Sequence, residues 1–301
     1  MNIKLIISMI PIMTILGCSS PQVIEPQPFS SENSYAYNIA NQTVLTKEYK
    51  GKKSPLRDFS LEDKKDVKDA FDKQSNADSM LGLSLVTLLS GNPMLALGGA
   101  GTSGLMAISN SKHISSNQTW LIALNKNDFS NELEAQKFIL NIISNSVTLE
   151  LSKYGEVKLK SPFKDYPSLK VFMVNMNGEW VRTSIYIQDG SLKKSFLTEE
   201  KTNINGKLTD SYVFGFNGEI TDIHTTLVSA PTPNILNHKD KSIKFDNIVS
   251  NITKDLPKGF YIYYPPFPKL RYEGENYINT LNPLPTIYTQ GKKYEFLKPT
   301  P

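Results

Sequence analysis

The sequence has 301 residues, with 33 basic and 29 acidic side chains and a formal net charge of +4 at neutral pH. This mild charge, without a basic stripe, excludes a nucleic-acid-binding surface of the usual kind. Because Cys18 is the only cysteine, an internal disulfide bond and metal sites built from several cysteines are also excluded.

The chain begins with one positive charge, Lys4, followed by an apolar run from Leu5 to Leu16. A run of this length is typical of a secretory signal peptide and is too short for a membrane-spanning helix. It ends in Ile15-Leu16-Gly17-Cys18, which resembles the lipobox of bacterial lipoproteins. The alternative is an ordinary signal peptide followed by a chance cysteine.

The resemblance covers residues 1–20 and implies a membrane anchor. In that family residues 1–17 would be removed as the signal peptide, and the Cys18 sulfur would carry diacylglycerol. Several acyl chains together hold a protein firmly to a membrane, and a thioether-linked sulfur cannot act as a nucleophile. Ser19 and Ser20 follow the cysteine, with no aspartate at the second position. By the sorting rule of the family this favours the outer membrane, with the protein facing the periplasm.

Residues 18–57 are rich in Ser, Pro, Asn and Gln and lack apolar periodicity. This composition predicts a flexible tether between the lipid and a folded body. Its densest charged run is KEYKGKK, from Lys47 to Lys53. We expect either a solvated loop or a contact with anionic lipid headgroups at this run.

Residues 58–115 are predicted to form a helical region. A weak apolar stripe predicts a solvated helix from about Leu61 to Lys73, capped by Ser60. From Ser79 to Ser111 the chain has no charged residue, but Asn92-Pro93 interrupts this stretch. Because proline breaks helices, neither half reaches membrane-spanning length, which predicts a helical hairpin.

The second half of this hairpin is glycine-rich and contains GGAGTSG at residues 98–104. The glycines fit G-x-G-x-x-G, but a dinucleotide site needs a βαβ unit around them, and none is indicated, so no nucleotide is expected. The hairpin would instead be buried in the protein, or would form a membrane-inserted or ring-forming helix pair. In both cases the contact positions are Gly98, Gly99, Gly101 and Gly104.

Residues 116–301 are predicted to be one periplasmic α+β domain. Trp120 to Leu124 is a short apolar strand, and a helix runs from about Asn131 to Ser146, capped by Ser130 or Asp128. The period of the pattern then changes to two, which predicts strands at Val147–Leu151 and at Glu156–Lys160.

An antiparallel β-meander with flanking helices is predicted for the centre of this domain. Dipeptides of the kind that fill type I′ turns recur at strand-length intervals, between apolar, β-branched and aromatic runs. They are Asn177-Gly178, Asp189-Gly190, Asn205-Gly206 and Asn217-Gly218. The predicted strands are Leu169–Met176, Trp180–Ile187, Leu192–Leu197, Tyr212–Phe216 and Ile220–Leu227.

The C-terminal part begins with helical spacing from Phe245 to Leu256. An aromatic and proline-rich tail follows and ends in a predicted hairpin that turns at Gln290-Gly291. Its tyrosines would either bind a peptide or glycan or cover a sheet with their hydroxyl groups in water. The candidate ligand surface consists of Tyr263, Tyr264 and Tyr272.

No catalytic constellation is visible in the sequence. Asp222 and His224 would share one strand face, which general-base chemistry or metal binding requires, but an exposed or hydrogen-bonded histidine is far commoner. The other histidines, His113 and His238, are scattered. The acids Glu199, Glu200 and Asp210 could supply a carboxylate pair, but acids in a loop are usually just solvated. We therefore predict no metal and no cofactor.

The sequence favours a non-catalytic cell-envelope lipoprotein that acts as a structural or assembly partner. Its partners would be the membrane, through lipidated Cys18, and other envelope proteins or further copies of itself. A component of a secretion, conjugation or pilus apparatus has this kind of role. Two alternatives are a ligand- or glycan-binding lipoprotein that uses the aromatic tail, and an envelope hydrolase with a site around His224.

Overall fold

The computed structural model describes residues 26–66, 113–161, 164, 168–188, 196–204, 206–216, 227–232, 244–266, 270–272, 275–279 and 283–300. These residues form an α+β fold of antiparallel sheets and helices, as the sequence predicts.

The larger sheet has the strand order β11-β10-β7-β1-β6-β5, and every neighbouring pair is antiparallel. Its central strand β1 is buried along almost its whole length, because neighbouring layers cover both faces of the sheet. The strands are β1 (Thr119–Asn125), β5 (Thr198–Ile204), β6 (Lys207–Phe214), β7 (Phe260–Tyr264), β10 (Thr286–Thr289) and β11 (Lys292–Glu295).

A smaller sheet contains β2 (Glu156–Lys160), β3 (Leu169–Met176) and β4 (Glu179–Gln188) in this order. β3 and β4 correspond to the first two strands of the predicted meander, and β2 to the strand predicted before it, whereas β5 and β6 belong to the larger sheet. Most of the predicted strands Leu192–Leu197 and Ile220–Leu227 lies outside the described residues. A separate hairpin consists of β8 (Leu270–Tyr272) and β9 (Glu275–Asn279).

Two predicted hairpin turns are confirmed by their backbone angles. Asn177 and Gly178 join β3 to β4 with φ values of 55° and 89°. Gln290 and Gly291 join β10 to β11 with φ values of 48° and 75°. Positive φ at both central residues is what a type I′ turn requires, and asparagine and glycine tolerate it best.

The main helices are α5 (Glu132–Leu151) and α6 (Phe245–Lys254). A short 3₁₀ turn, η3 (Lys126–Asp128), leads from β1 toward α5. The α5 cap is Asn131, whose side chain accepts a hydrogen bond from the Glu134 N–H, so the predicted caps are displaced by this residue.

The prediction of a strand at Val147–Leu151 is wrong, because this segment is the last part of α5. Ile143, Val147 and Leu151 are all buried and recur every four residues, which continues the helical face of α5. Within residues 147–151, apolar and polar side chains also alternate, and this alternation resembles the pattern of a strand.

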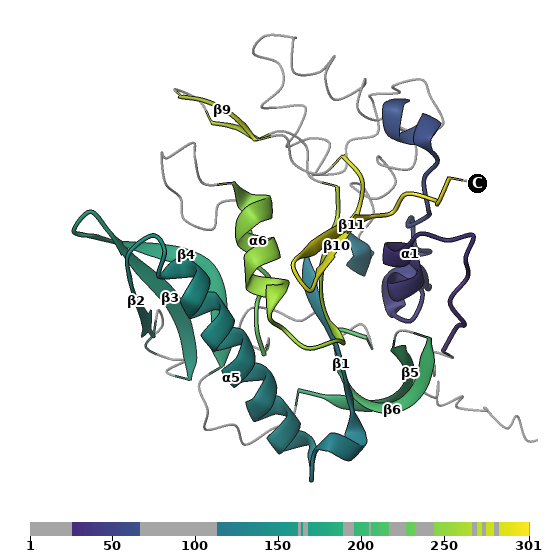
Figure 1. Cartoon of the computed structure of the whole chain (residues 1–301), viewed down its shortest axis with the longest axis horizontal. Coiled ribbons are helices and arrows are strands. Elements are labelled where there is room, and N and C mark those ends of the chain that lie inside the picture. Colours follow the sequence, from purple (N-terminus) through teal and green to yellow (C-terminus); the bar gives the residue numbers. More distant parts are fainter. Residues whose placement is uncertain are drawn as a thin grey trace, which may run out of the picture.

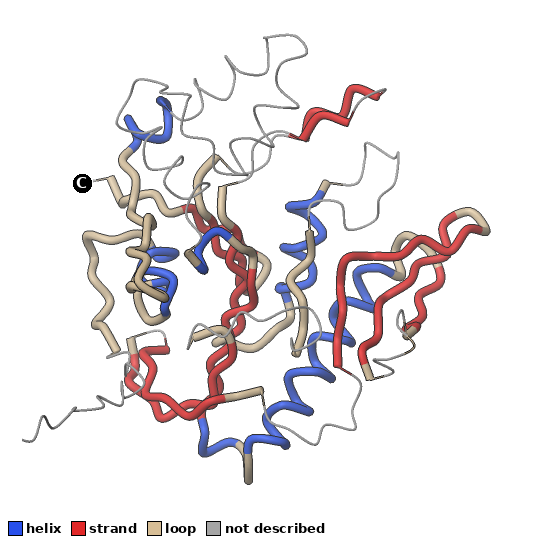
Figure 2. Tube along the Cα trace, turned by 180° about the vertical axis from the view of Figure 1, so that it is seen from behind, coloured by secondary structure: helices blue, strands red, loops and turns tan. Residues whose placement is uncertain are grey.

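Both helices lie between the two sheets. Figure 1 shows this order across the molecule: the β2–β4 sheet, then α5 and α6, then the larger sheet, and finally α1 (Tyr35–Ala40) on the far side. Figure 2 shows the same order from behind. One hydrophobic cluster joins the two helices to both sheets, and Trp120, Ile139, Phe172 and Ile248 are fully buried in it.

The other face of the larger sheet is covered by residues 26–59. This segment contains α1 and a 3₁₀ turn, η1 (Val44–Thr46). Its apolar side chains share a second cluster with β1, β7 and β10, and the fully or almost fully buried ones are Ala36, Ile39, Ala40, Leu45 and Phe59. We call residues 26–59 the N-terminal layer.

The predicted flexible tether at 18–57 is therefore wrong from Pro26 onward, while residues 18–25 lie outside the described part of the chain. The folded domain is predicted to start at residue 116, but the N-terminal layer precedes this residue and is part of the same fold. The boundary falls inside another 3₁₀ turn, η2 (Ile114–Ser116), and the N-terminal layer shares its core with strands from the predicted domain.

Hydrogen bonds from polar side chains hold the N-terminal layer together. Asn38 accepts from the Ser30 N–H at 2.9 Å and donates to the Ser30 carbonyl at 2.8 Å. Gln42 accepts from the Gln27 N–H at 3.2 Å and donates to the Gln27 carbonyl at 2.7 Å. Polar residues that resemble a solvated linker in the sequence thus form hydrogen bonds with backbone N–H and C=O groups of a packed segment.

A helix follows the layer at residues 61–66. The predicted cap is confirmed, because the Ser60 hydroxyl accepts a hydrogen bond from the Asp63 N–H at 3.0 Å. Leu61 is 55% exposed, which agrees with the expected solvated helix over its described residues. The remaining residues of the predicted helix and of the Gly-rich hairpin lie outside the described part.

Two glycines allow the neighbouring chain to approach β1 closely. Gly215 follows β6 with φ of 76°, and a Cβ there would lie 2.1 Å from the Trp120 carbonyl oxygen. Gly259 precedes β7 with φ of 97°, and a Cβ there would lie 2.1 Å from the Ala123 carbonyl oxygen. Only glycine fits these positions without a shift of the backbone.

Candidate functional site

The candidate ligand surface in the C-terminal tail is largely contradicted. Tyr263 and Tyr264 are both 0% exposed. The Tyr263 hydroxyl donates to the Ser115 carbonyl at 2.7 Å, and the Tyr264 hydroxyl donates to the Pro231 carbonyl at 2.9 Å. Burial raises the pKa of both phenols well above the usual value.

The alternation of side chains along β7 explains this error. Successive residues of a strand point to opposite faces of a sheet, and here both faces are covered. Tyr263 therefore packs under the N-terminal layer, and Tyr264 packs on the side of α6. Tyr272 lies in β8, but its side chain is outside the described part of the structure.

Several other predicted site residues lie outside the described residues altogether. Cys18 is one of them, and the prediction of lipidation there stays a prediction. The same holds for the pair Asp222 and His224, for His238, and for the glycine contact positions Gly98, Gly99, Gly101 and Gly104.

The acids Glu199, Glu200 and Asp210 lie in β5 and β6 rather than in the expected loop. Glu199 forms an ion pair with Lys126, and Asp210 lies opposite Lys201 in the strand register. Burial raises the pKa of Glu200. Because Glu199 and Glu200 are adjacent in a strand, their side chains point to opposite faces, so they do not form a carboxylate pair.

His113 is fully buried and connects the N-terminal layer to the start of β1. The Ser115 N–H donates to Nδ1 at 3.1 Å, and Nε2 lies 2.7 Å from the Lys47 carbonyl oxygen. Since a carbonyl only accepts, Nε2 carries the proton of a neutral imidazole. Burial lowers the pKa of His113, in opposition to the hydrogen bond with Lys47. This histidine is a structural link between two segments.

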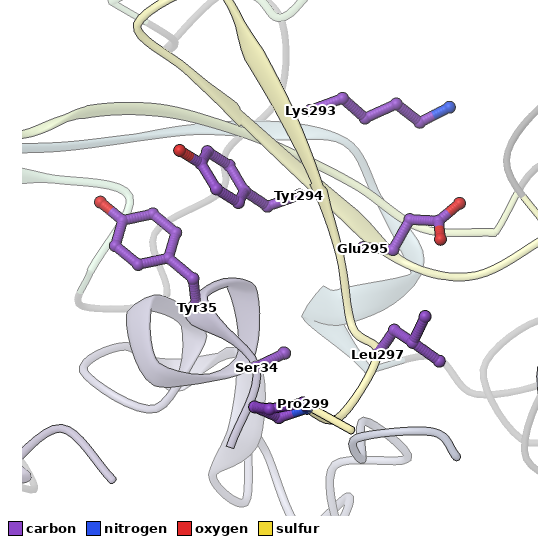
Figure 3. A pocket seen from close by; sticks show the side chains of 7 residues that line it. All are labelled: Ser34, Tyr35, Lys293, Tyr294, Glu295, Leu297 and Pro299. Carbon is purple, nitrogen blue, oxygen red and sulfur yellow. The ribbon is translucent and has the colours of Figure 1, made fainter. Parts of the chain in front are cut away.

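The structure contains an open hollow where α1 meets the edge strand β11 (Figure 3). Its volume is about 490 Å³. It is lined by residues of the N-terminal layer and of the last residues of the chain, namely Ser34, Tyr35, Lys293, Tyr294, Glu295, Leu297 and Pro299.

Two tyrosines form the aromatic wall of this hollow. Figure 3 shows Tyr35 from α1 and Tyr294 from β11 on the same side of the strand. Their ring centroids are 4.6 Å apart, and the planes are tilted by 46°. Burial raises the pKa of Tyr35, and the neighbouring Tyr294 adds to the shift, so Tyr35 keeps its phenolic proton at neutral pH.

Two charged residues lie on the other side of β11. Lys293 and Glu295 point away from the tyrosines because side chains alternate along the strand. Lys293 forms an ion pair with Asp246 of α6 at 2.7 Å, and Glu295 forms one with Lys64. Both charges are thus already partnered within the chain, so the tyrosine rings are the groups that offer binding surface.

A buried carboxylate fixes the position of α1 beside this hollow. Asp58 accepts hydrogen bonds from the Ser34 N–H and the Ser34 hydroxyl, both at 2.6 Å. The Ser34 hydroxyl in turn accepts from the Tyr37 N–H at 3.0 Å and caps the helix. Burial raises the pKa of Asp58, although the Ser34 hydrogen bonds and the charge of Lys298 oppose the shift.

Reasoning from the sequence missed this hollow because its two walls come from segments about 260 residues apart. In the sequence, Tyr35 belongs to the predicted tether and Tyr294 to a predicted terminal hairpin. The one available signal was the aromatic content of SYAYNIA, which is unusual for a solvated linker. Chemically, the hollow presents aromatic faces on which a planar or apolar group can stack.

Within the described residues, no group of three or more His, Cys, Asp or Glu side chains is placed to hold a metal ion. The helices in this part of the chain are all too short or too polar to cross a membrane. Comparisons of the chain with protein-family models, curated proteins and solved structures find no match.

Proposed function

We propose that this chain is a non-catalytic lipoprotein of the bacterial cell envelope that acts as a structural or assembly partner. Its role would resemble that of a component of a secretion, conjugation or pilus apparatus. In this proposal residues 1–17 are removed, and acylated Cys18 holds the protein at the outer membrane, facing the periplasm.

The observation that carries the proposal is that the packed N-terminal layer already includes residue 26. Pro26 is the first residue of the N-terminal layer and lies only eight residues after Cys18 in the sequence. A chain of this length spans at most about 29 Å when fully extended. A tether that continued to residue 57 would span up to about 140 Å.

A body held at so short a distance stays beside the membrane that carries its anchor. This position suits a protein that assembles with other membrane-bound proteins, because partners on the same surface meet it at high local concentration. It does not suit a protein that must reach across the envelope to collect a distant ligand. The short link therefore supports the assembly role over the role of a long-range binding protein.

The anchor is tested by mass spectrometry of the Cys18 peptide from protein extracted from its native cells. The proposal expects residues 1–17 to be absent and the sulfur to carry acyl chains. A Cys18→Ser variant is expected to leave the outer-membrane fraction, whereas a Ser19→Ala variant is the matched control and should stay there. A free thiol at Cys18 in the mature protein would overturn the proposed location.

The assembly role is tested by the size of the detergent-extracted protein. We expect the lipidated chain to migrate as a complex with further copies or with other envelope proteins, and crosslinking in cells should give the same neighbours. If the chain is a monomer in detergent and crosslinks to no envelope protein, the assembly role is wrong even where the anchor is present.

A second candidate function is binding of a peptide or glycan at the aromatic hollow. The observation that favours it is the placement of Tyr35 and Tyr294 at the wall of an open hollow. Tyr294→Ala should then weaken binding to a peptide or glycan library by at least tenfold, while Tyr294→Phe keeps the ring and should bind normally. Equal binding by both variants would exclude this site.

A further inference from the structure

The basic run Lys47–Lys53 forms a tight turn with a defined backbone. The Tyr49 N–H donates to the Lys52 carbonyl at 2.8 Å, and the Lys52 N–H donates to the Tyr49 carbonyl at 2.9 Å. Lys50 and Gly51 occupy the two central positions, with φ values of 48° and 73°. These are the features of a type I′ turn. We call residues 47–53 the basic turn.

The basic turn concentrates positive charge at one exposed point. It contains four lysines and a single acid, Glu48, and therefore carries a net charge of +3. The three lysines nearest its tip, Lys50, Lys52 and Lys53, are exposed. Among the residues that the structure describes, no carboxylate forms an ion pair with any lysine of the turn. Lys50 Nζ lies 5.1 Å from the centroid of the Tyr49 ring, a contact that leaves its positive charge unneutralised, so the exposed lysines can attract an external anion.

The base of the turn is fixed to the body of the protein. The Lys47 carbonyl oxygen lies 2.7 Å from Nε2 of buried His113. The ring of Tyr49 packs edge-on against the His113 ring, with centroids 6.2 Å apart. The Ser54 hydroxyl donates to the carbonyl of Leu45, a fully buried residue. The backbone of an anchored turn loses little further freedom on binding, which favours a contact surface.

A short path along the chain connects the basic turn with the point where the chain would leave the membrane. Gln27, nine residues after Cys18, exchanges two hydrogen bonds with Gln42. Lys47 is the fifth residue after Gln42, a distance of at most about 18 Å along the chain. Since residue 18 lies at most about 32 Å along the chain from Gln27, this path allows a surface that holds residue 18 to contact the turn as well.

We propose that the basic turn binds the headgroups of anionic phospholipids and forms a second membrane contact beside the acyl anchor. A lysine near an anionic surface gains about 1 kcal/mol, and a basic patch acts together with acyl chains in stable membrane attachment. Two contacts would also fix the orientation of the body, so that one face is turned toward the membrane. The turn is a site distinct from Cys18, and the proposal is tested without the acyl group.

The test uses a chain that begins at Ser19, because it retains every described residue and lacks both the apolar run and the cysteine. Its circular dichroism spectrum and unfolding transition establish that it folds. Co-sedimentation is then measured with vesicles of phosphatidylglycerol and phosphatidylcholine and with vesicles of phosphatidylcholine alone. We expect binding only to the anionic vesicles, and we expect it to weaken as salt is raised.

The decisive variant replaces Lys50, Lys52 and Lys53 by glutamine. Three lysines at about 1 kcal/mol each correspond to a loss of affinity on the order of a hundredfold. The matched control replaces three other exposed lysines, Lys137, Lys160 and Lys207, and changes the net charge equally. It should retain most of the binding.

Three results would overturn the inference: no binding to anionic vesicles, equal binding to phosphatidylcholine alone, or an equal loss in the two triple variants. None of them bears on the acyl anchor, which the mass of the Cys18 peptide decides separately. Failure of this proposal is thus distinguishable from failure of the proposed function.

Discussion

The two faces of the six-stranded sheet are buried equally well but covered in different ways. Trp120 and Ile122 of β1 point toward α5 and α6, whereas Leu121 and Ala123 point toward the N-terminal layer. All four are fully or almost fully buried. One face is covered by two regular helices, and the other by a segment whose regular elements are only α1 and η1.

The helix face is held mainly by periodic apolar side chains, while the layer face also needs specific polar contacts. Helices satisfy their own backbone groups, so α5 and α6 can cover the sheet with an apolar stripe. An irregular segment leaves many N–H and C=O groups without partners inside it. In the N-terminal layer, Asn38, Gln42 and Asp58 satisfy such groups through their side chains. Polar composition is thus compatible with a core layer.

The largest expected effect comes from Phe59→Ala, which tests whether the N-terminal layer unfolds together with the helix face. Phe59 is fully buried, so its truncation should lower the free energy of unfolding by about 3–5 kcal/mol. The measurement is urea unfolding of the chain beginning at Ser19, followed by tryptophan fluorescence, to which buried Trp120 of β1 and Trp180 of β4 contribute. The transition should stay single, with a lower midpoint.

The matched control is Leu61→Ala, two residues away, where the side chain is 55% exposed. Its effect should stay within about 0.5 kcal/mol. If Phe59→Ala is as mild as this control, the layer does not belong to the cooperative core, and the predicted tether that extends to residue 57 would have to be reconsidered.

A smaller loss is expected when a polar contact of the layer is removed without changing its apolar packing. Asp58→Ala leaves the Ser34 N–H buried without its acceptor, and Ser34 loses the partner that orients its capping hydroxyl. The cost should be about 2–3 kcal/mol, as for a buried hydrogen bond to a charged group. Glu62→Ala removes an exposed acid nearby and should be neutral in the same unfolding measurement. Equal effects of the two changes on the free energy of unfolding would show that the hydrogen bonds of Asp58 do not stabilise the fold.

The difference between the two faces also explains which parts of the fold were predictable from the sequence. The predicted α6 begins at Phe245, as observed, because its apolar residues repeat at helical spacing. The β3 boundaries and the two type I′ turns were correct because alternation and turn residues are local signals. In contrast, the burial of Ala36 and Ile39 depends on a sheet whose strands lie far away in the sequence.

The candidate site was harder to predict than the fold for the same reason. The hollow combines Tyr35 with Tyr294, and no local pattern relates these residues to each other. The tyrosines of β7 were misassigned because an aromatic strand has the same sequence whether one face or both faces of its sheet are covered. Only the presence of the N-terminal layer decides that Tyr263 is buried.

A pH-dependent effect is expected at the junction between the layer and the sheet. Burial lowers the pKa of His113 below its ordinary value of 6.5, so the unfolded chain binds the proton first as the pH falls. The stabilisation is therefore complete above about pH 6.5 and declines below it, because a protonated Nδ1 can no longer accept from the Ser115 N–H.

The measurement is the free energy of unfolding between pH 7.5 and pH 5 for the unsubstituted chain and for His113→Gln, at about the same ionic strength. The unsubstituted chain should lose more stability on acidification than the variant, whose side chain does not titrate. Parallel curves would mean that His113 makes no contribution to the pH dependence, and the link between Lys47 and Ser115 would then be independent of protonation.

The smallest expected effect compares the two faces through adjacent residues of one strand. Tyr263→Phe removes the hydroxyl that donates to the Ser115 carbonyl under the N-terminal layer, and Tyr264→Phe removes the one that donates to Pro231 on the helix side. Each change keeps the ring and should cost about 1 kcal/mol, as for a neutral buried hydrogen bond. Equal losses in urea unfolding would mean that both layers are equally well packed. A loss confined to Tyr264→Phe would place the weaker layer on the N-terminal side, where water could then replace the missing hydroxyl.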